Sequence, residues 1–137
     1  RLGALQELNL DQHNLKVLPE EVGTLQHLTS LFLCGNQLTA LPDSLTSLPN
    51  LHNLYIFGNM LTTLPDGLLD MPQIKEISAA GNKLESLGRF TTGSQSLSTL
   101  GLPSNLFATL PAHLGNLTNL TRLRLQGNRL QRLPPTI

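Results

Sequence analysis

Residues 28–50 read LTSLFLCGNQLTALPDSLTSLPN, and residues 51–73 read LHNLYIFGNMLTTLPDGLLDMPQ. Both stretches carry the pattern L-x-x-L-x-L-x-x-N-x-L-x-x-L-P-x-x-L-x-x-L-x-x. Outward from them, units of 23 residues begin at positions 5, 28, 51, 74 and 97, and a last unit of 18 residues covers 120–137. Self-similarity at a fixed period of about 20 to 50 residues is typical of repeat architectures. The repeat therefore decides the fold.

The spacing inside one unit predicts a strand followed by a return path. Positions 4 and 6 are apolar and alternate with variable residues, as in a strand with one buried face. Leucine at position 11 returns the chain to the core, and proline at position 15 lacks the N–H that strand pairing on the far side needs. Positions 18 and 21 suit a short helical or irregular turn. A single unit leaves its sides open, so the units must stack.

The pattern resembles the leucine-rich repeat family in its 23-residue form, with Leu-Pro after the asparagine. The resemblance covers the whole chain and implies an α/β solenoid, a right-handed horseshoe with a concave parallel β-sheet and an irregular or short-helical convex side. Residues 1–137 then form one domain, with a partial repeat at 1–4, repeats at 5–27, 28–50, 51–73, 74–96 and 97–119, and a truncated repeat at 120–137. Because Leu2 and Ile137 fall inside incomplete units, we interpret the chain as a fragment of a longer repeat protein.

Position 9 is occupied by a ladder of asparagines. A buried amide has donors and an acceptor that can satisfy turn backbone groups within and between units. The first unit has His13 there, which is either an end-of-array substitution or a titrating group. The ladder consists of Asn36, Asn59, Asn82, Asn105 and Asn128.

Composition excludes several classes of protein. Leucine supplies 34 of the 137 residues, so the chain is too apolar for disorder. Nine basic and nine acidic residues cancel, which argues against non-specific nucleic-acid binding. No apolar run approaches the ~18 residues of a membrane span. Since no signal peptide is visible, we expect a cytoplasmic protein, with a secreted bacterial effector as the alternative.

Catalytic and metal-binding patterns are absent from the sequence. There is no phosphate-binding, nucleophile-elbow or zinc-protease motif. The four histidines fall at four different repeat positions, and the single cysteine, Cys34, has Asp11 and Phe57 as register neighbours, neither of which would lower its pKa. We therefore expect no enzymatic activity, no cofactor and no metal in this chain.

Aromatic residues concentrate on the predicted concave face. Phe32 and Tyr55 at position 5 and Phe57 at position 7 are three of the five aromatic residues of the chain. Solvent-facing aromatic residues are enriched at binding hot spots, and Cys34 and Met60 extend the group. Smaller residues follow along the array, namely Ser78, Ala80, Gly101 and Pro103. The alternative is that Phe32 and Tyr55 are merely a cross-strand pair.

Charge is asymmetric along the array. Residues 1–70 hold seven acids and two bases, for −5, and residues 71–137 hold two acids and seven bases, for +5. On the inner face, Glu7 and Asp11 lie at one end, and Arg122, Arg124 and Arg129 lie at the other. Complementary potential steers association and sets orientation, although a simple solvated edge would also account for these charges.

We expect a protein–protein interaction module that binds a protein or peptide on its concave face. The expected contact residues are Asp11, Phe32, Cys34, Tyr55, Phe57, Met60, Arg122 and Arg124. Proteins with similar repeats serve as adaptors in Ras-pathway scaffolds and plant intracellular repeat proteins. Others are recruitment arms of kinases, Roco GTPases and effector ubiquitin ligases, so an arm of a multidomain enzyme is the alternative.

Two further features have open interpretations. The sequence G-R-F-T-T-G-S at 88–94 replaces the usual proline and outer apolar positions, and it is either a tolerated loop or a hinge or secondary contact. The glycosylation triplets at Asn116 and Asn119 arise from the repeat itself, but they would also fit an extracellular receptor fragment.

Overall fold

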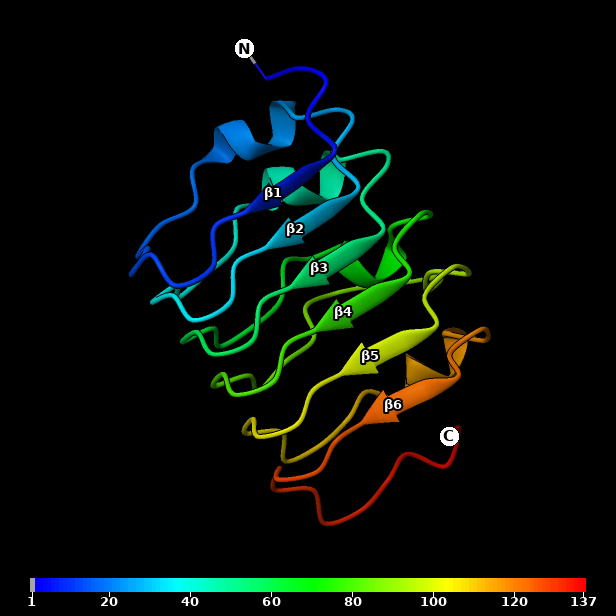
Figure 1. Ribbon diagram of the computed structural model, residues 1–137. Helices are drawn as coiled ribbons and strands as arrows, with labels where there is room; N and C mark the ends of the chain where they lie inside the picture. The colour runs from blue at the N-terminus through cyan, green and yellow to red at the C-terminus, as the bar shows by residue number, and fades with distance from the viewer. Residues whose placement is uncertain (1) are drawn as a thin grey trace.

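Six short strands form one parallel sheet in chain order (Figure 1). The computed structural model describes residues 2–137. Each strand pairs with the next at an offset of one repeat, so that Leu8 faces Leu31 and Leu31 faces Leu54. The strands are β1 (Glu7–Asn9), β2 (Ser30–Phe32), β3 (Asn53–Tyr55), β4 (Glu76–Ser78), β5 (Thr99–Gly101) and β6 (Arg122–Arg124). The two ends of the chain lie at opposite ends of the array (Figure 1), and the predicted solenoid with a parallel sheet is confirmed.

The leucines of the repeat form one continuous core. At position 4 the side chains of Leu31, Leu54, Ile77 and Leu100 have no exposed surface, and neither have Leu33 and Ile56 at position 6. Burying one such side chain contributes about 1.5–3 kcal/mol. Because strand residues alternate between faces, burial of these positions directs positions 3, 5 and 7 to the opposite, concave side.

The return path carries 3₁₀ helices in four of the described units. They are η1 (Glu20–Thr24), η2 (Asp43–Ser47), η3 (Leu68–Asp70) and η4 (Ala112–Asn116). Each begins close after the repeat proline, whose carbonyl accepts the first turn's hydrogen bond, as in Leu45 N–H to Pro42 O at 3.1 Å. Because proline has no N–H, it prevents strand pairing on the convex side. Its fixed φ also suits the residue that precedes a helix, so the turn begins there.

The asparagine ladder links every unit to its neighbours. The Asn59 amide donates to Leu33 O at 2.9 Å and to Ile56 O at 3.2 Å, and its oxygen accepts from Leu38 N–H at 3.1 Å. Asn36, Asn82, Asn105 and Asn128 repeat this arrangement. His13 is exposed, and its backbone N–H, rather than its ring, donates to Asn36 Oδ1.

The irregular unit is held tightly against the unit before it. The described residues 79–98 form no helix. Phe90 is 5% exposed and fills the place of the missing outer apolar residues. The carboxylate of Asp70 accepts hydrogen bonds from Thr91 N–H and Gly93 N–H, the latter at 2.9 Å. This bonding favours a tolerated loop over a hinge.

Candidate functional site

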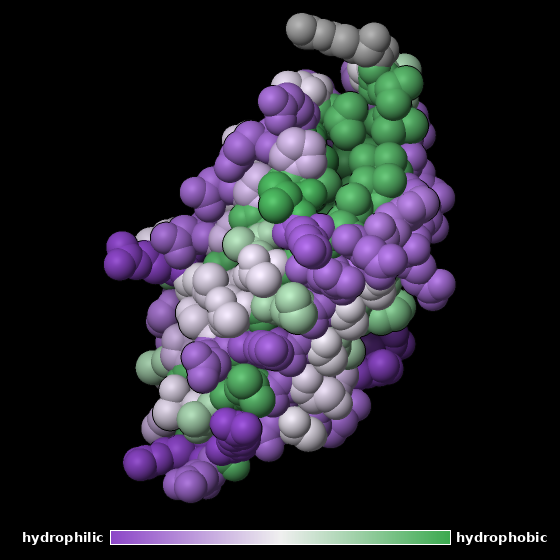
Figure 2. Space-filling model, turned by 90° about the vertical axis from the view of Figure 1, so that its left-hand side faces the viewer, coloured by the Kyte–Doolittle hydropathy of each residue, from purple (hydrophilic) through white to green (hydrophobic). Residues whose placement is uncertain are grey.

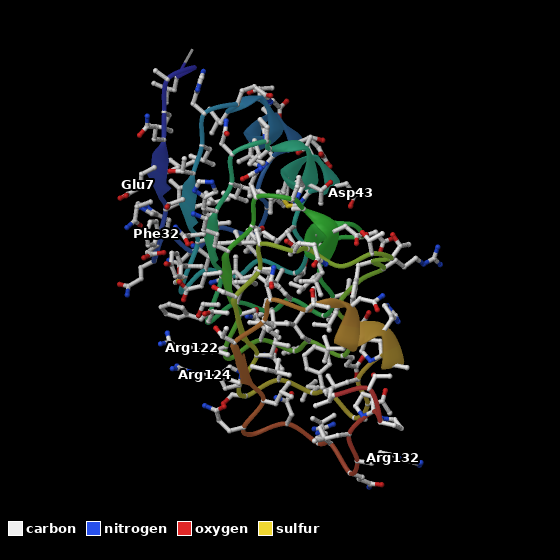
Figure 3. All side chains as sticks on the ribbon, turned by 90° about the vertical axis from the view of Figure 1, so that its right-hand side faces the viewer. Glu7, Phe32, Asp43, Arg122, Arg124 and Arg132 are labelled. Carbon is white, nitrogen blue, oxygen red and sulfur yellow. The ribbon has the colours of Figure 1, made fainter. Side chains whose placement is uncertain are left out.

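The concave face is formed by side chains that the core does not use. Figure 3 shows Glu7, Phe32, Arg122 and Arg124 on one side of the ribbon, and Asp43 on the opposite side. Residues at positions 3 and 5 come from the strands themselves, and position 7 follows each strand by two residues. Since the buried apolar residues and the asparagine ladder hold the shape, these positions are free to differ between units.

Phe32 and Tyr55 stack on each other across β2 and β3. Their ring centroids lie 4.7 Å apart with 18° between the planes. The pairing that the sequence left as an alternative is therefore real. Both residues are nevertheless only half-buried, so each keeps surface toward solvent. A stacked pair of this kind is pre-ordered and loses little side-chain entropy when a partner binds.

Tyr55 is fixed further by a residue that the sequence analysis did not single out. Its hydroxyl lies 3.2 Å from Glu76 Oε2 on β4. Burial, together with the nearby Glu76 carboxylate, raises the pKa of Tyr55 above its ordinary value of 10, so the phenol remains a hydrogen-bond donor at neutral pH. Glu76 could have been identified from the sequence, because it occupies position 3 of the next unit and so lies on the same face as Tyr55.

Phe57 and Met60 are the exposed apolar residues of the third unit. Phe57 has 47% of its surface exposed and Met60 has 38%. They lie on either side of Gly58, whose φ of 69° makes the turn after β3. No packing in the folded chain requires an aromatic ring at this place, because Ala80 occupies the same position in the next unit.

Cys34 corrects one of the predicted contact residues. Only 3% of its surface is exposed, so its side chain cannot serve as a contact for a partner. It is short, it lies between the longer residues Asp11 and Phe57 in register, and its N–H donates to Asp11 Oδ1 at 2.7 Å. Burial, reinforced by the Asp11 carboxylate, raises the pKa of the Cys34 thiol to about 11. The thiol is therefore not a nucleophile at neutral pH.

The stretch between the aromatic residues and the arginines has small side chains. Ser78 and Ala80 follow Tyr55 and Phe57 on the next unit, and Gly101 and Pro103 come after them. A Cβ placed on Gly101 would meet its nearest atom, Ile77 O, only at 3.8 Å. Close packing therefore does not require the glycine, since a Cβ there would make ordinary van der Waals contacts, and Gly101 itself is buried.

The two ends of the face have opposite charges. Glu7 is exposed on β1, whereas Arg122 and Arg124 are exposed on β6. In the sheet register the two arginines face Thr99 and Gly101, neither of which is charged. Asp11 is half-buried and its carboxylate is already bonded to Cys34 N–H, so Glu7 is the freer acid at its end.

Other surfaces offer less specific features. Figure 2 shows hydrophobic atoms gathered at the N-terminal end of the molecule. There an apolar hollow of about 540 Å³ is lined by Leu8, Leu10, Leu18 and Val22, among others. These residues occupy apolar repeat positions of the first unit, the same positions that are buried in the second and third units.

The described residues 2–137 offer neither a metal site nor a membrane-spanning helix, and the two glycosylation triplets lie at contacts between units. No three His, Cys, Asp or Glu side chains come together there as metal ligands. No helix in the same residues is long and apolar enough to cross a membrane. Asn116 Nδ2 donates to Thr91 O at 2.9 Å, and Asn119 Nδ2 donates to Gln95 O. Both asparagines thus have a structural use in joining units.

Solved structures with the same architecture come from bacteria and plants. A leucine-rich repeat protein of Leptospira interrogans is 35% identical over 98% of this chain, with a TM-score of 0.74. The ectodomain of the Arabidopsis thaliana membrane receptor kinase GASSHO1/SCHENGEN3, in complex with CASPARIAN STRIP INTEGRITY FACTOR 2, is 27% identical over 98% of this chain, with a TM-score of 0.81. A Shigella effector domain is 30% identical over 95%, with a TM-score of 0.73.

The chain spans 40%, 17% and 53% of those three chains, respectively. No curated protein matches it significantly. A family model described as leucine rich repeat matches residues 3–61 and 27–84, and a second model of the same description matches residues 119–137. With the 23-residue register and the asparagine ladder, these matches show that the chain belongs to the leucine-rich repeat family.

Proposed function

We propose that the chain is a non-catalytic recognition module that binds a protein or peptide on its concave face. The observation that carries the proposal is the exposure of Phe57, at 47%, beside the stacked pair of Phe32 and Tyr55. Desolvation of exposed aromatic side chains is a main source of binding energy at protein interfaces. The Arabidopsis receptor ectodomain, which shares the fold, was solved with a bound partner.

Alanine substitution of the three aromatic residues tests this proposal. We expect the triple variant Phe32→Ala, Tyr55→Ala and Phe57→Ala to lose at least tenfold in capture of a partner that the unchanged chain retains. Circular dichroism should be nearly unchanged, because none of the three belongs to the buried core. The matched control is Val17→Ala, which removes an apolar side chain that is 74% exposed outside the strands. Equal capture by the triple variant and the control would contradict the proposal.

A second candidate is that the chain is the recruitment arm of a larger enzyme. The fact in its favour is that the chain spans 17% of the ectodomain of a receptor kinase and 53% of an effector domain. In that case the same concave face selects the substrate and the chemistry lies in another domain. The two candidates differ in the fate of the captured protein, which an enzyme would modify and a scaffold would release unchanged.

We also propose an intracellular location. Cys34 is a free, buried thiol, and both glycosylation triplets use their amides to join repeats. Expression through a secretory pathway with an intact mass measurement tests this: a glycan on Asn116 or Asn119 that leaves the melting temperature unchanged would contradict it.

A further inference from the structure

We infer that the concave face binds an extended peptide segment in which an apolar side chain and a carboxylate are about four to five residues apart, with the carboxylate toward the C-terminal repeats. This inference rests on the proposed function and adds to it the chemistry, the spacing and the direction of the ligand. Three features of one surface carry it: the aromatic residues of the second and third units, the small side chains beyond them, and the arginines of β6. Figure 3 labels Phe32 from the first group and Arg122 and Arg124 from the last, all on the same side of the ribbon.

The spacing follows from the sheet. Phe57 lies two residues beyond the end of β3, and Arg122 and Arg124 lie on β6, three strands further along. Three strand spacings of about 4.8 Å make about 14 Å across the sheet, and Phe57 lies two residues further along the strand direction than Arg124, so these two residues are about 16 Å apart. An extended chain advances about 3.3–3.6 Å per residue. A segment that crosses the strands therefore reaches from Phe57 to Arg124 in about four to five residues.

The strands between the two features carry small side chains at repeat positions 5 and 7. These residues are Ser78, Ala80, Gly101 and Pro103; Gly101 is itself buried, and a Cβ placed on it would meet its nearest atom, Ile77 O, at 3.8 Å. A peptide backbone that crosses these strands meets no long side chain at positions 5 and 7, which favours a narrow, extended ligand.

Charge sets the direction. The guanidinium groups of Arg122 and Arg124 are exposed, and their register partners on β5 are uncharged. A carboxylate placed there gains charge-assisted hydrogen bonds. In the reverse direction the same carboxylate would approach Glu7 and the acidic first half of the chain, which carries −5. Glu76 also repels an acid from the position-3 edge at β4, so the ligand's acid belongs at β6.

Selection from random dodecapeptides tests the inference on the whole chain. One library is displayed with a free carboxyl terminus and the other with the terminus fused, which separates a terminal carboxylate from an Asp or Glu side chain. We expect enrichment of an aromatic or aliphatic residue followed, three to five residues later, by a carboxylate. Synthetic hits in which the carboxylate is replaced by its amide should bind at least tenfold more weakly.

Three variants locate the ligand. Phe57→Ala should abolish selection, and Arg122→Glu with Arg124→Glu should replace the enriched acid by Lys or Arg. Gly101→Val should weaken the binding of the selected peptides at least tenfold, because the branched valine side chain would stand in the path of the peptide. Valine itself is well suited to a strand. Ala108→Val, on an exposed residue beyond the turn after β5, is the matched control and should bind normally.

Two kinds of failure are distinguishable. Hits that depend on Phe57 but show no spaced carboxylate, or that ignore Gly101→Val, would overturn this inference and leave the proposed function standing. Hits that are independent of Phe57, or no enrichment over the Phe57→Ala chain, would overturn both. Capture of a folded protein through the aromatic residues, with no peptide selected, would also refute the peptide chemistry.

Discussion

Replacing Asn59 by alanine should destabilise the chain by about 3–5 kcal/mol, although the change removes only one polar side chain. Asn59 is 7% exposed and makes three hydrogen bonds to backbone groups of its own and the preceding unit. The two carbonyls that it donates to, Leu33 O and Ile56 O, each keep a second donor, from Asn36 and Asn82 respectively. The N–H of Leu38 is different, because its bond to Asn59 Oδ1 has no substitute.

The magnitude follows from this inventory. Each lost hydrogen bond contributes about 0.5–1.5 kcal/mol, and a buried N–H left without a partner costs a further 1–3 kcal/mol or so. Asn128 offers the matched comparison, because it makes the same three bonds but is only half-buried. Water can reach the groups that Asn128→Ala leaves open, so this variant should lose about 1–2 kcal/mol.

Urea unfolding measures the difference. Circular dichroism reports the whole array, and fluorescence of Tyr55, the single tyrosine in a chain without tryptophan, reports its centre. Repeat units contact mainly their neighbours, so coincidence of the two transitions must be checked before a free energy is taken. The control is Asn50→Ala, which removes one exposed bond to Gln26 O. A loss below about 1 kcal/mol for Asn59→Ala, or equal losses for Asn59 and Asn128, would refute the reasoning.

Three further perturbations test other parts of the structure. Gly88→Ala should lower the free energy of unfolding by several kcal/mol more than Gly67→Ala. Both glycines have positive φ, so alanine costs about 1–2 kcal/mol of backbone strain at either position. In addition, a Cβ on Gly88 would lie 2.4 Å from Leu64 O, whereas no atom lies within 4 Å of a Cβ on Gly67. Equal melting temperatures would contradict this. The pKa of Cys34 is raised from 9 to about 11 in the folded chain. At pH 8 the thiol is therefore about 0.1% thiolate when folded and about 10% thiolate when unfolded, so alkylation should be about 100-fold slower in the folded chain than in urea. Because only the folded state disfavours ionisation, stability should also fall between pH 9 and about 11, and a fast native reaction would disprove the burial. Asp70→Ala should raise amide exchange at Thr91 and Gly93 at least tenfold, with Leu100 unaffected, since the carboxylate holds both of the former N–H groups; uniform exchange would contradict it.

The fold was predictable from sequence because each structural role recurs at one repeat position. Leucines at positions 4 and 6 and asparagine at position 9 report the same geometry in every unit, so one register assigns both faces of the sheet. Phe90 was also predictable, since a gap in the apolar pattern needs a filler. The concave side chains have no such redundancy, and their mutual contacts depend on rotamers that a pattern does not encode. The burial of Cys34 between its neighbours and the bond from Tyr55 to Glu76 are of this kind.

The number of repeats between the two contact groups sets the length of ligand that can reach both, and a last prediction follows from this dependence. The distance from Phe57 to the arginines is set by the number of strands between β3 and β6. Inserting a second copy of residues 97–119 before residue 120 adds one strand that carries the same small residues, Gly101 and Pro103. The distance between the two contact groups then grows by about 4.8 Å. The preferred separation of apolar residue and carboxylate should then lengthen by one to two residues, while the side chains of both contact groups stay unchanged. An unaltered spacing in selected peptides would show that the ligand does not cross the strands as an extended chain, because no local change at either group could compensate for the added repeat.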